Sequence, residues 1–433
     1  MANSRGVSRR KFLESAAIGA GALALGRHGA LAEQLDGSTL RHLDHSGIDH
    51  VIVVMMENRS FDHMLGWLPA ADGKQAGLTY FDRAALPHDT YPLAPDYQGC
   101  THPDPDHSYE GGRIEYNGGA CDGWLRAGEN DEYAIGYYVE NDVPFFAQAT
   151  PDWTVCDRYF AAMLGPTFPN RIYQHAAQTD RLANTFEPST LPTIWDRLAG
   201  AGLTGRYYFQ DAPFLALWGP KYLPITRPYT SFLLACATGR LPHVSFVDPS
   251  FIGELAGTSR DDHPHADIRN GQAFLNEVYT AVTNSPAWKR TLLVINYDEW
   301  GGFFEHVPPD TAPIPPASLA AGDTDGRRGF RVPCLLISPY ATRGLVTHDV
   351  FDHTSVLRFI EWRWGLEPLT VRDETANNLA AALDFSQHNK KRPASQYAVP
   401  PGPFGAPCPS ASSSEDNPWI ILRDIAQSVG FQG

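Results

Sequence analysis

HVIVVMM, residues 50–56, is apolar throughout after its first residue, and Glu57 and Asn58 follow it directly. A run of this length without polar alternation is typical of a strand covered on both faces of a parallel sheet. The same pattern predicts further strands over residues 243–247, 292–297 and 333–338. Apolar residues at helical spacing predict helices over residues 170–178, 193–200, 268–283 and 354–364. This alternation indicates an α/β fold, a doubly wound and mostly parallel sheet with helices on both faces.

Polar side chains stand directly after three of the predicted strands. Glu57 and Asn58 follow the first, Asp248 follows the second, and Asp298 and Glu299 follow the third. A single acidic residue in such a place is often only a helix cap. Ligands of open α/β sheets bind beyond the carboxyl ends of the strands, however, and these residues converge there. Their oxygen atoms suit a divalent cation, Ca²⁺, Mg²⁺ or Mn²⁺, while nearby histidines leave Zn²⁺ open.

The segment GPTFPNR, residues 165–171, presents a hydroxyl at the start of a predicted helix. Thr167 lies between two prolines, where free backbone N–H groups and the helix dipole favour a phosphoryl group. Considered alone, Thr167 would be interpreted as a helix cap. Asn170 and Arg171 add hydrogen-bond donors, and an arginine binds phosphate oxygens in a bidentate manner.

Several histidines lie close to acidic residues in the sequence. His263 belongs to DDHPHAD (261–267), His306 follows Glu305, His353 begins a predicted helix, and His107 falls in a Tyr-, Asp- and Gly-rich stretch. A lone histidine is usually a surface or core residue. Histidine is nevertheless the side chain best able to donate a proton near neutral pH, so we expect some of these to act on the substrate.

The charge balance excludes some partners. The chain of 433 residues has 34 basic and 49 acidic residues, for a formal charge of −15. A nucleic-acid partner would need a basic surface, and electrostatic docking on anionic lipid would need one as well. An acidic chain is instead compatible with a site that collects divalent cations.

The first 32 residues are expected to be a twin-arginine signal peptide. SRRKFL (8–13) precedes a weakly apolar stretch, and ALA (30–32) is a cleavage-type sequence. The predicted partner is the twin-arginine export machinery, and the predicted location is the periplasm, the cell envelope or the outside of a bacterial cell. No later apolar run is long enough to span a bilayer, so we expect no integral membrane segment in the mature form.

Residues 33–398 are predicted to form one catalytic domain. A long insertion is expected at about 80–140 and a lid-like loop at about 305–332, followed by a linker and tail at 399–433. No cysteine pair has the spacing of a zinc site. In an oxidising compartment Cys100 and Cys121 could close a loop, although sequence alone does not fix connectivity.

Taken together, these segments resemble the bacterial phospholipase C family, which also includes a periplasmic acid phosphatase. The resemblance rests on residues 50–69, 165–171, 261–272, 296–309, 333–341 and 352–361, in this order. Two departures are Glu305 before His306, where many members have Asp, and Asp262, where Glu is more usual. The family is similar in fold to the alkaline phosphatase superfamily, so the resemblance implies an alkaline phosphatase-like sheet with long loop insertions.

The resemblance implies a role for each matching residue. Thr167 would be the nucleophile and His263 the general acid, with His107 and His353 in support. Phosphate would be bound by Asn58, Asn170, Arg171 and His306. The metal ligands would be Glu57, Asn58, Thr167, Asp298 and Glu299.

The implied reaction is phosphoester hydrolysis through a metal-activated Thr167 and a phosphothreonine. The substrate would be a phosphodiester such as a phosphatidylcholine-like lipid. Tyrosines and Trp124 in the 80–140 insertion could hold a choline group by cation–π contact, or could simply pack the insertion. The alternatives are an acid phosphatase acting on phosphomonoesters and a secreted binding protein without turnover.

Overall fold

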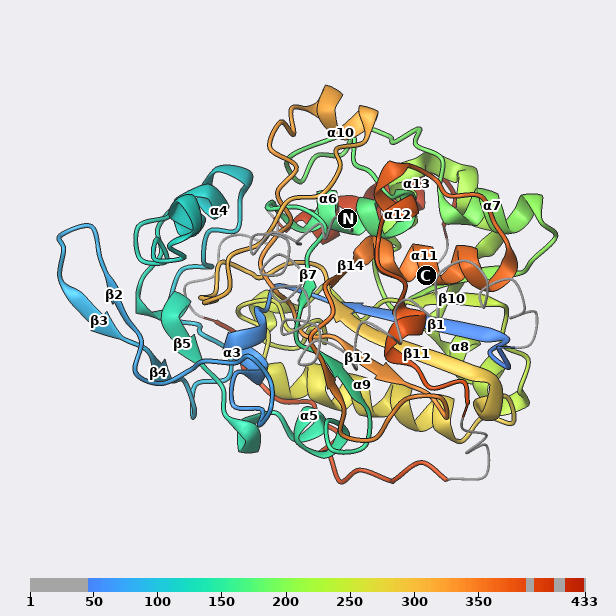
Figure 1. Ribbon diagram of the computed structural model, residues 1–433, viewed down its shortest axis with the longest axis horizontal. Coiled ribbons are helices and arrows are strands. Elements are labelled where there is room, and N and C mark those ends of the chain that lie inside the picture. The colour runs from blue at the N-terminus through green and yellow to red at the C-terminus, as the bar shows by residue number, and fades with distance from the viewer. Residues whose placement is uncertain (1–45, 387–392, 409–416, 432–433) are drawn as a thin grey trace, which may run out of the picture. The chain divides into compact units, whose positions relative to one another are not determined.

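The central sheet of the computed structural model has eight strands in the order β13-β6-β12-β11-β1-β10-β8-β9 (Figure 1). The structure describes residues 46–386, 393–408 and 417–431. The signal peptide predicted at residues 1–32 lies outside them. The strands of this sheet are β1 (His50–Met56), β6 (Thr154–Cys156), β8 (Gly205–Phe209), β9 (Thr226–Pro228), β10 (Val244–Val247), β11 (Thr291–Tyr297), β12 (Leu335–Ile337) and β13 (Val346–Thr347).

The pairings confirm a mostly parallel sheet and correct one strand. β1 runs parallel to both β10 and β11, and every residue of β1 after His50 is buried. β12 is antiparallel to both β11 and β6, although its apolar run was expected to be a parallel strand. An apolar run reports burial on both faces and carries no information about direction. Because β12 is reversed, its last residues lie at the opposite edge, where Ser338 Oγ donates to the carbonyl of Thr291 at 2.9 Å.

Helices cover both faces of the sheet, as predicted. In Figure 1, α5 and α9 lie below the sheet, and α6, α7, α11 and α12 lie above it. The helices are α3 (Phe61–Leu65), α4 (Tyr109–Tyr116), α5 (Pro144–Ala149), α6 (Thr167–Ala176), α7 (Ile194–Gly200), α8 (Tyr229–Thr238), α9 (Ile268–Thr283), α10 (Pro316–Ala321), α11 (His353–Trp364), α12 (Val371–Glu374) and α13 (Pro418–Ser428). Asp267 caps α9 and Asp352 caps α11 through their side chains, which explains where both helices begin.

The 80–140 segment shares a small core with residues from later in the chain. It contains α4 and the short strands β2 (Thr79–Phe81), β3 (Pro87–Asp89), β4 (Tyr91–Pro92) and β5 (Gly136–Tyr137). Two further short strands elsewhere, β7 (Tyr159–Phe160) and β14 (Phe351–Asp352), pair with each other. Trp124 packs with Trp300, Phe304 and Phe330 in a buried cluster, and Tyr133 and Tyr138 are fully buried. These three rings therefore pack the insertion, while choline binding by the insertion stays a prediction.

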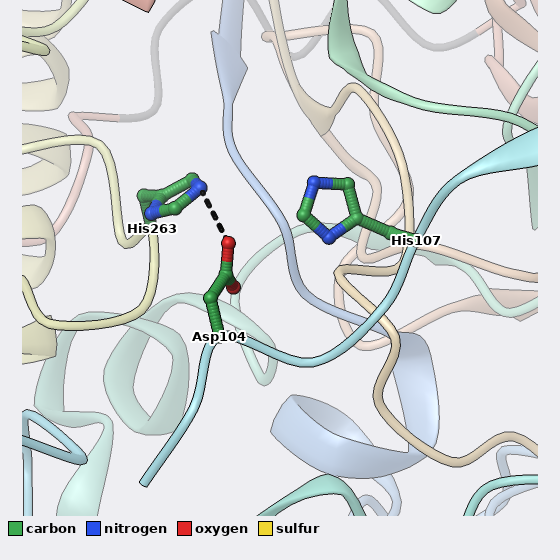
Figure 2. A group of neighbouring side chains, drawn as sticks. All are labelled: Asp104, His107 and His263. Carbon is green, nitrogen blue, oxygen red and sulfur yellow. Dashed lines mark ion pairs between the residues drawn. The ribbon is translucent and has the colours of Figure 1, made fainter. Parts of the chain in front are cut away.

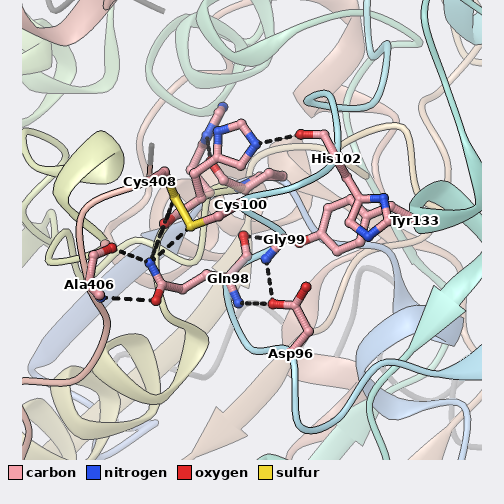
Figure 3. Close-up of a disulfide and its surroundings, with 12 residues drawn as sticks. Asp96, Gln98, Gly99, Cys100, His102, Tyr133, Ala406 and Cys408 are labelled. Carbon is pink, nitrogen blue, oxygen red and sulfur yellow. Dashed lines mark hydrogen bonds between the residues drawn. A yellow bond between two sulfur atoms is a disulfide. The ribbon is translucent and has the colours of Figure 1, made fainter. Parts of the chain in front are cut away.

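Cys100 forms its disulfide with Cys408, so the predicted partner Cys121 is wrong (Figure 3). Cys121 is a buried free thiol in the cluster around Trp124. Two hydrogen bonds hold the segment before Cys408 against Gln98. The Gln98 amide donates to the carbonyl of Ala406 at 2.8 Å and accepts from the Ala406 N–H at 3.0 Å. The bridge joins positions 308 residues apart, which no local spacing could indicate.

Beyond the disulfide, the described part of the tail folds back onto the domain. α13 packs against the 3₁₀ segment Phe214–Ile225, and Trp419 and Leu422 are buried in the main core. None of the helices in the described residues is long and apolar enough to cross a membrane.

Candidate functional site

The carboxyl ends of β1 and β11 bring the predicted acidic residues together. The register places Met56 beside Tyr297, so that Glu57 and Asn58 leave the sheet next to Asp298 and Glu299. The Asp298 carboxylate accepts from the backbone N–H groups of Asn58 at 3.1 Å and Glu299 at 2.7 Å. The strand-end prediction of one shared acidic edge is therefore confirmed for the positions of these residues.

The chain turns sharply at both strand ends. Asn58 has a φ of 57°, which asparagine tolerates better than most residues, and Gly301 has a φ of +65°. A Cβ at position 301 would stand 2.2 Å from the carbonyl oxygen of Asn58. Gly301 is thus required for the close approach of the two loops that carry the acidic residues.

Arg171 lies among these carboxylates. Its Nε donates to Asp298 Oδ2 at 2.9 Å, and its terminal nitrogens lie 3.9 Å from Glu57 and 3.6 Å from Asp248. Burial alone would lower the pKa of Arg171, but the charges of Asp298 and Glu57 raise it above its usual value. The side chain was predicted to bind phosphate. In this structure it is held as a cation among carboxylates.

Thr167 is the first residue of α6, and its hydroxyl faces Glu57. The N-cap position belongs to Pro166, which caps nothing with its side chain, so the interpretation of Thr167 as a helix cap is wrong. Thr167 Oγ lies 3.4 Å from Glu57 Oε1, and the residue is 3% exposed. The stiff turn thus buries the hydroxyl against a carboxylate at the N-terminus of a helix.

Three predicted cation ligands each have a buried oxygen atom that accepts no hydrogen bond in the described structure. Within the described residues, Glu57 Oε2, Asn58 Oδ1 and Glu299 Oε1 are buried and accept no hydrogen bond. Asp298, in contrast, has both oxygens engaged. Burial raises the pKa of both Glu57 and Glu299 well above the ordinary value. Unsatisfied buried oxygens of this kind fit a divalent cation, because an unpaired buried polar group is otherwise costly.

Two further buried carboxylates adjoin Glu57. Atoms of Glu57, Glu254 and Asp261 lie within 4.8 Å of one another and could share a cation. Glu254 Oε1 and Asp261 Oδ2 are also buried without a partner in the described structure. Glu57 is thus the carboxylate common to the predicted ligands and to this second group.

A third group, of mixed nitrogen and oxygen atoms, lies beside Asn58 (Figure 2). Asp104, His107 and His263 place one atom each within 4.8 Å of one another. Asn58 Nδ2 lies 3.3 Å from His107 Nε2, and His263 Nε2 lies 3.6 Å from Asp104 Oδ2. The structure therefore brings His107 and His263 to the predicted site and adds Asp104.

The first turn of α13 closes over the same residues. Trp419 Nε1 donates to Glu57 Oε1 at 3.2 Å, and its ring stacks on Phe251 at 3.7 Å between centroids. Asn417, the N-cap of α13, donates to Glu254 Oε2 at 3.0 Å. The C-terminal tail thus contributes side chains to the site.

Three predicted site residues have other surroundings. His353 lies behind Asp298, with Nε2 2.7 Å from the Asp298 carbonyl, and burial lowers its pKa to about 4. Asn170 uses its whole amide to hold the 163–166 turn. His306 lies in a separate ionic network, bonded to Asp62. Within the described residues, no hydrogen bond or ion pair joins any of the three to Thr167.

Sequence reasoning missed Asp104, Glu254, Asp261 and Trp419 as site residues. Asp261 was visible beside His263, within a segment already singled out. Asp104 lies in an irregular loop and Glu254 begins a 3₁₀ turn of three residues, so no periodicity marks either of them. Trp419 is far along the chain, and only the fold brings it to Glu57.

The larger cavity of the described structure lies away from the predicted site residues. The larger of the two described cavities, about 250 Å³, is lined by Ser338, Tyr340 and Trp288, on the reversed end of β12. A cavity of about 10 Å³ lies beside Arg171 and Asp248. The predicted site residues are buried and the first turn of α13 covers them, so the space beside them is small.

Relatives of this chain carry phospholipase C names. Phospholipase C A of Mycobacterium tuberculosis is 30% identical, over 90% of this chain and 87% of its own length. Phospholipase C B of the same organism is 32% identical, over 88% and 86%. Non-specific phospholipase C3 of Arabidopsis thaliana is 29% identical, over 78% and 74%.

Solved structures with a related arrangement are distant. A protein of the alkaline phosphatase superfamily from Vibrio parahaemolyticus covers 76% of this chain and 70% of its own, with 10% identity and a TM-score of 0.39. The lipoteichoic acid synthase LtaP of Listeria monocytogenes covers 88% and 91%, with 9% identity and a TM-score of 0.39.

A family model decides the assignment. The model described as the phosphoesterase family matches residues 48–367, which include β1, α6 and β11 with the acidic edge between them. The described relatives agree with it over most of the chain. The chain therefore belongs to the phosphoesterase family and is a phosphoric ester hydrolase.

Proposed function

We propose that the protein is a phospholipase C-type phosphodiesterase in which Thr167 is the nucleophile. The observation that carries the proposal is the buried Thr167 hydroxyl, 3.4 Å from Glu57 and at the N-terminus of α6. Arg171 lies about one turn after Thr167 in the same helix and places a positive charge at the same edge. The relatives named phospholipase C support the diester reaction.

The proposed reaction has two steps. Thr167 Oγ attacks phosphorus while its proton passes to Glu57, and the bond from phosphorus to the alcohol oxygen breaks. The alcohol leaves with a proton taken from water, and Glu57 gives its proton to the hydroxide that results. Water then attacks the phosphothreonine, releases a phosphomonoester and restores the hydroxyl. Backbone N–H groups in the first turn of α6 offset negative charge on the phosphoryl oxygens, while Arg171 stays paired with three carboxylates.

A divalent cation fits the residues at this edge. Glu57, Asn58 and Glu299 would hold it through their unpartnered oxygens. When bound, a cation of this kind lowers the pKa of a hydroxyl and offsets phosphoryl charge. The oxygen-rich set favours Ca²⁺, Mg²⁺ or Mn²⁺.

His263 was predicted to protonate the leaving alcohol. Burial lowers its pKa to about 4, so at pH 7 the imidazole is neutral. Its Nδ1 lies 2.8 Å from the Pro264 carbonyl, to which it donates. As a general acid, His263 would therefore act only in acidic solution, and turnover at neutral pH needs another way to offset charge on the leaving oxygen.

An extracytoplasmic location is part of the proposal. The Cys100–Cys408 disulfide supports an oxidising compartment, and the SRRKFL leader supports twin-arginine export. The substrate is then a phospholipid or another phosphoester encountered outside the cytoplasm.

The sequence left two alternatives to this proposal, and one of them is still open. A phosphomonoesterase would use the same Thr167 and cation ligands, so only substrate tests distinguish it. A binding protein without turnover is not supported, because the proposed nucleophile and the carboxylates are all present and close together.

The test uses Thr167→Val and Thr167→Ser as a matched pair. The mature protein is assayed on phosphatidylcholine, p-nitrophenyl phosphorylcholine and p-nitrophenyl phosphate. Thr167→Val should lose at least about 10⁴-fold in kcat, while Thr167→Ser, which keeps a hydroxyl, should retain turnover. Wild-type kcat in Thr167→Val would refute the nucleophile, and hydrolysis of the monoester alone would refute the diesterase.

A further inference from the structure

The β2–β3 hairpin is anchored at its base beside the acidic edge. Side chains of β2 alternate, so that Tyr80 is buried between two exposed neighbours. Tyr80 belongs to the buried cluster of Trp300, which follows Glu299 directly, and Phe304. In Figure 1 the hairpin lies beyond α3, on the side of the sheet where β1 ends. The base of the hairpin is thus tied to the chain segment that leaves the acidic edge.

The tip of the same hairpin is apolar and exposed. Phe81 is 49% exposed and Leu86 is 58% exposed. Ala84, Ala85 and Pro87 are exposed as well, so five of the seven residues from 81 to 87 are exposed and apolar. Single exposed apolar residues are ordinary on a protein surface, but a contiguous group of them marks an interaction site.

The turn satisfies its own backbone donors. Asp82 Oδ1 accepts from the N–H groups of Ala84 and Leu86, each at 2.8 Å. The N–H of Ala85 donates to the Asp82 carbonyl at 3.0 Å, and His88 Nε2 lies 3.2 Å from Asp82 Oδ2. A backbone N–H that enters a lipid interface without a partner is costly, and this turn avoids that cost at three successive residues. A protein that bound by hydrogen bonds would find these three donors already used.

Charge decides which lipid surface fits the tip. The guanidinium of Arg83 donates to the carbonyl of Arg126 at 3.2 Å and to that of Gly128, so its charge is held against the insertion. The whole chain has a formal charge of −15. Attraction to anionic lipid needs a cluster of basic residues, which this tip does not present. The surface that fits is therefore a zwitterionic one, which is bound through buried apolar area.

We propose that residues 81–87, the tip of the β2–β3 hairpin, insert into the interface of a zwitterionic lipid bilayer and dock the protein there. The docking itself rests on the exposed apolar group and on the satisfied turn. Its use rests on the proposed function: the docked protein would hold its acidic edge near the phosphodiester groups of the lipid.

The experiment measures vesicle binding separately from turnover. The mature protein is sedimented with large unilamellar vesicles of phosphatidylcholine, on ice and with lipid in excess, so that little lipid is hydrolysed. The variants are Phe81→Ser and Leu86→Ser, alone and together. The matched control is Leu234→Ser, because Leu234 is 64% exposed on α8, away from the hairpin (Figure 1). Hydrolysis of soluble p-nitrophenyl phosphorylcholine and the melting temperature report whether each variant keeps an intact site and fold.

We expect each single replacement to weaken binding to phosphatidylcholine vesicles by about 5-fold and the double replacement by about 25-fold, because about half of each side chain is left to be buried. Leu234→Ser should bind as the wild type does. Hydrolysis of phosphatidylcholine vesicles should fall with binding, while hydrolysis of the soluble diester should not. Phosphatidylglycerol added to the vesicles should not strengthen binding of the wild type.

Four results would overturn the proposal. They are vesicle binding by the double variant that equals the wild type, an equal loss in Leu234→Ser, binding only when anionic lipid is present, and no sedimentation of the wild type with phosphatidylcholine. The last result would indicate a protein as the partner of the tip. Failure of the proposed function is a different outcome, because a wild type that binds vesicles through the tip but hydrolyses neither phosphatidylcholine nor the soluble diester would keep the docking surface and lose the phosphodiesterase.

Discussion

Trp419 offers the sharpest test of whether the tail belongs to the active site. Its indole N–H donates to Glu57 Oε1 at 3.2 Å, the same oxygen that lies 3.4 Å from the Thr167 hydroxyl. Trp419→Phe removes the donor and keeps most of the ring that stacks on Phe251. A buried hydrogen bond to a charged group contributes about 1.5–3 kcal/mol.

That free energy sets the expected effect on catalysis. If the whole contribution is lost in the transition state, kcat/KM falls by about 10- to 150-fold. The hydrogen bond from Trp419 lowers the pKa of Glu57 against the larger effect of burial, so its removal raises that pKa further. If Glu57 must be ionised for turnover, the variant becomes protonated and inactive at a higher pH than the wild type does. The acidic limb of its pH–rate profile should therefore shift to higher pH.

The assay compares kcat/KM against pH for Trp419→Phe and for Trp67→Phe. Trp67 donates to the Met64 carbonyl at 2.9 Å, so its variant loses an indole hydrogen bond where none of the site residues is involved. Urea unfolding reports the stability of both. If Trp419→Phe kept the wild-type rate and profile while both variants lost similar stability, Trp419 would only pack the core and the reasoning would fail.

Two other predictions concern what holds the domain together. Cys408→Ser opens a 308-residue loop and should lower the free energy of unfolding by about 2–5 kcal/mol, as measured by urea denaturation. Reduced wild-type protein is the control and should lose the same amount. An unchanged free energy of unfolding would contradict the structural role of the bridge. Asp352→Asn should cost about 3–5 kcal/mol, because Asp352 is buried between Arg328 at 2.7 Å and Arg372 at 2.9 Å. Burial would raise the pKa of Asp352, but these two arginines hold it well below its usual value. Its contribution to the free energy of unfolding is therefore present above about pH 4 and is lost as the pH falls. Melting temperatures measured against pH should show a weaker acid dependence in the variant.

The sequence predicted the middle of the sheet and missed its edges. The four predicted strands became β1, β10, β11 and β12, which lie side by side in the sheet order. Central strands are covered on both faces, so their sequences are continuous apolar runs. β6, β8, β9 and β13 are short or carry polar residues, as in Gly205–Phe209, and no periodicity distinguishes them from loops.

The site was predictable to the extent that it follows from strand ends. Glu57, Asp298 and Glu299 stand one or two residues after a strand, so the register of parallel strands brings them together. Asp104 lies in an irregular segment and Trp419 in the first turn of α13, and it is tertiary packing rather than local pattern that brings both to this edge. The disulfide partner of Cys100 was missed for the same reason.

Removal of divalent cations should reveal how much the acidic edge depends on them. Five buried carboxylates, Glu57, Glu254, Asp261, Asp298 and Glu299, lie at this edge, and Arg171 pairs with Glu57 and Asp298 among them. Like charges destabilise a fold unless a cation binds among them, and a cation that binds only the folded state at 100 times its Kd contributes about 2.7 kcal/mol. Exhaustive chelation should therefore lower the melting temperature, and added Mn²⁺ or Ca²⁺ should restore it in wild type but much less in Glu57→Gln. His88→Ala, away from the edge, should respond as wild type does. If chelation leaves the melting temperature unchanged once bound metal is shown to be gone, the carboxylates are held by Arg171 and the tail alone, and the cation ligands proposed here are wrong.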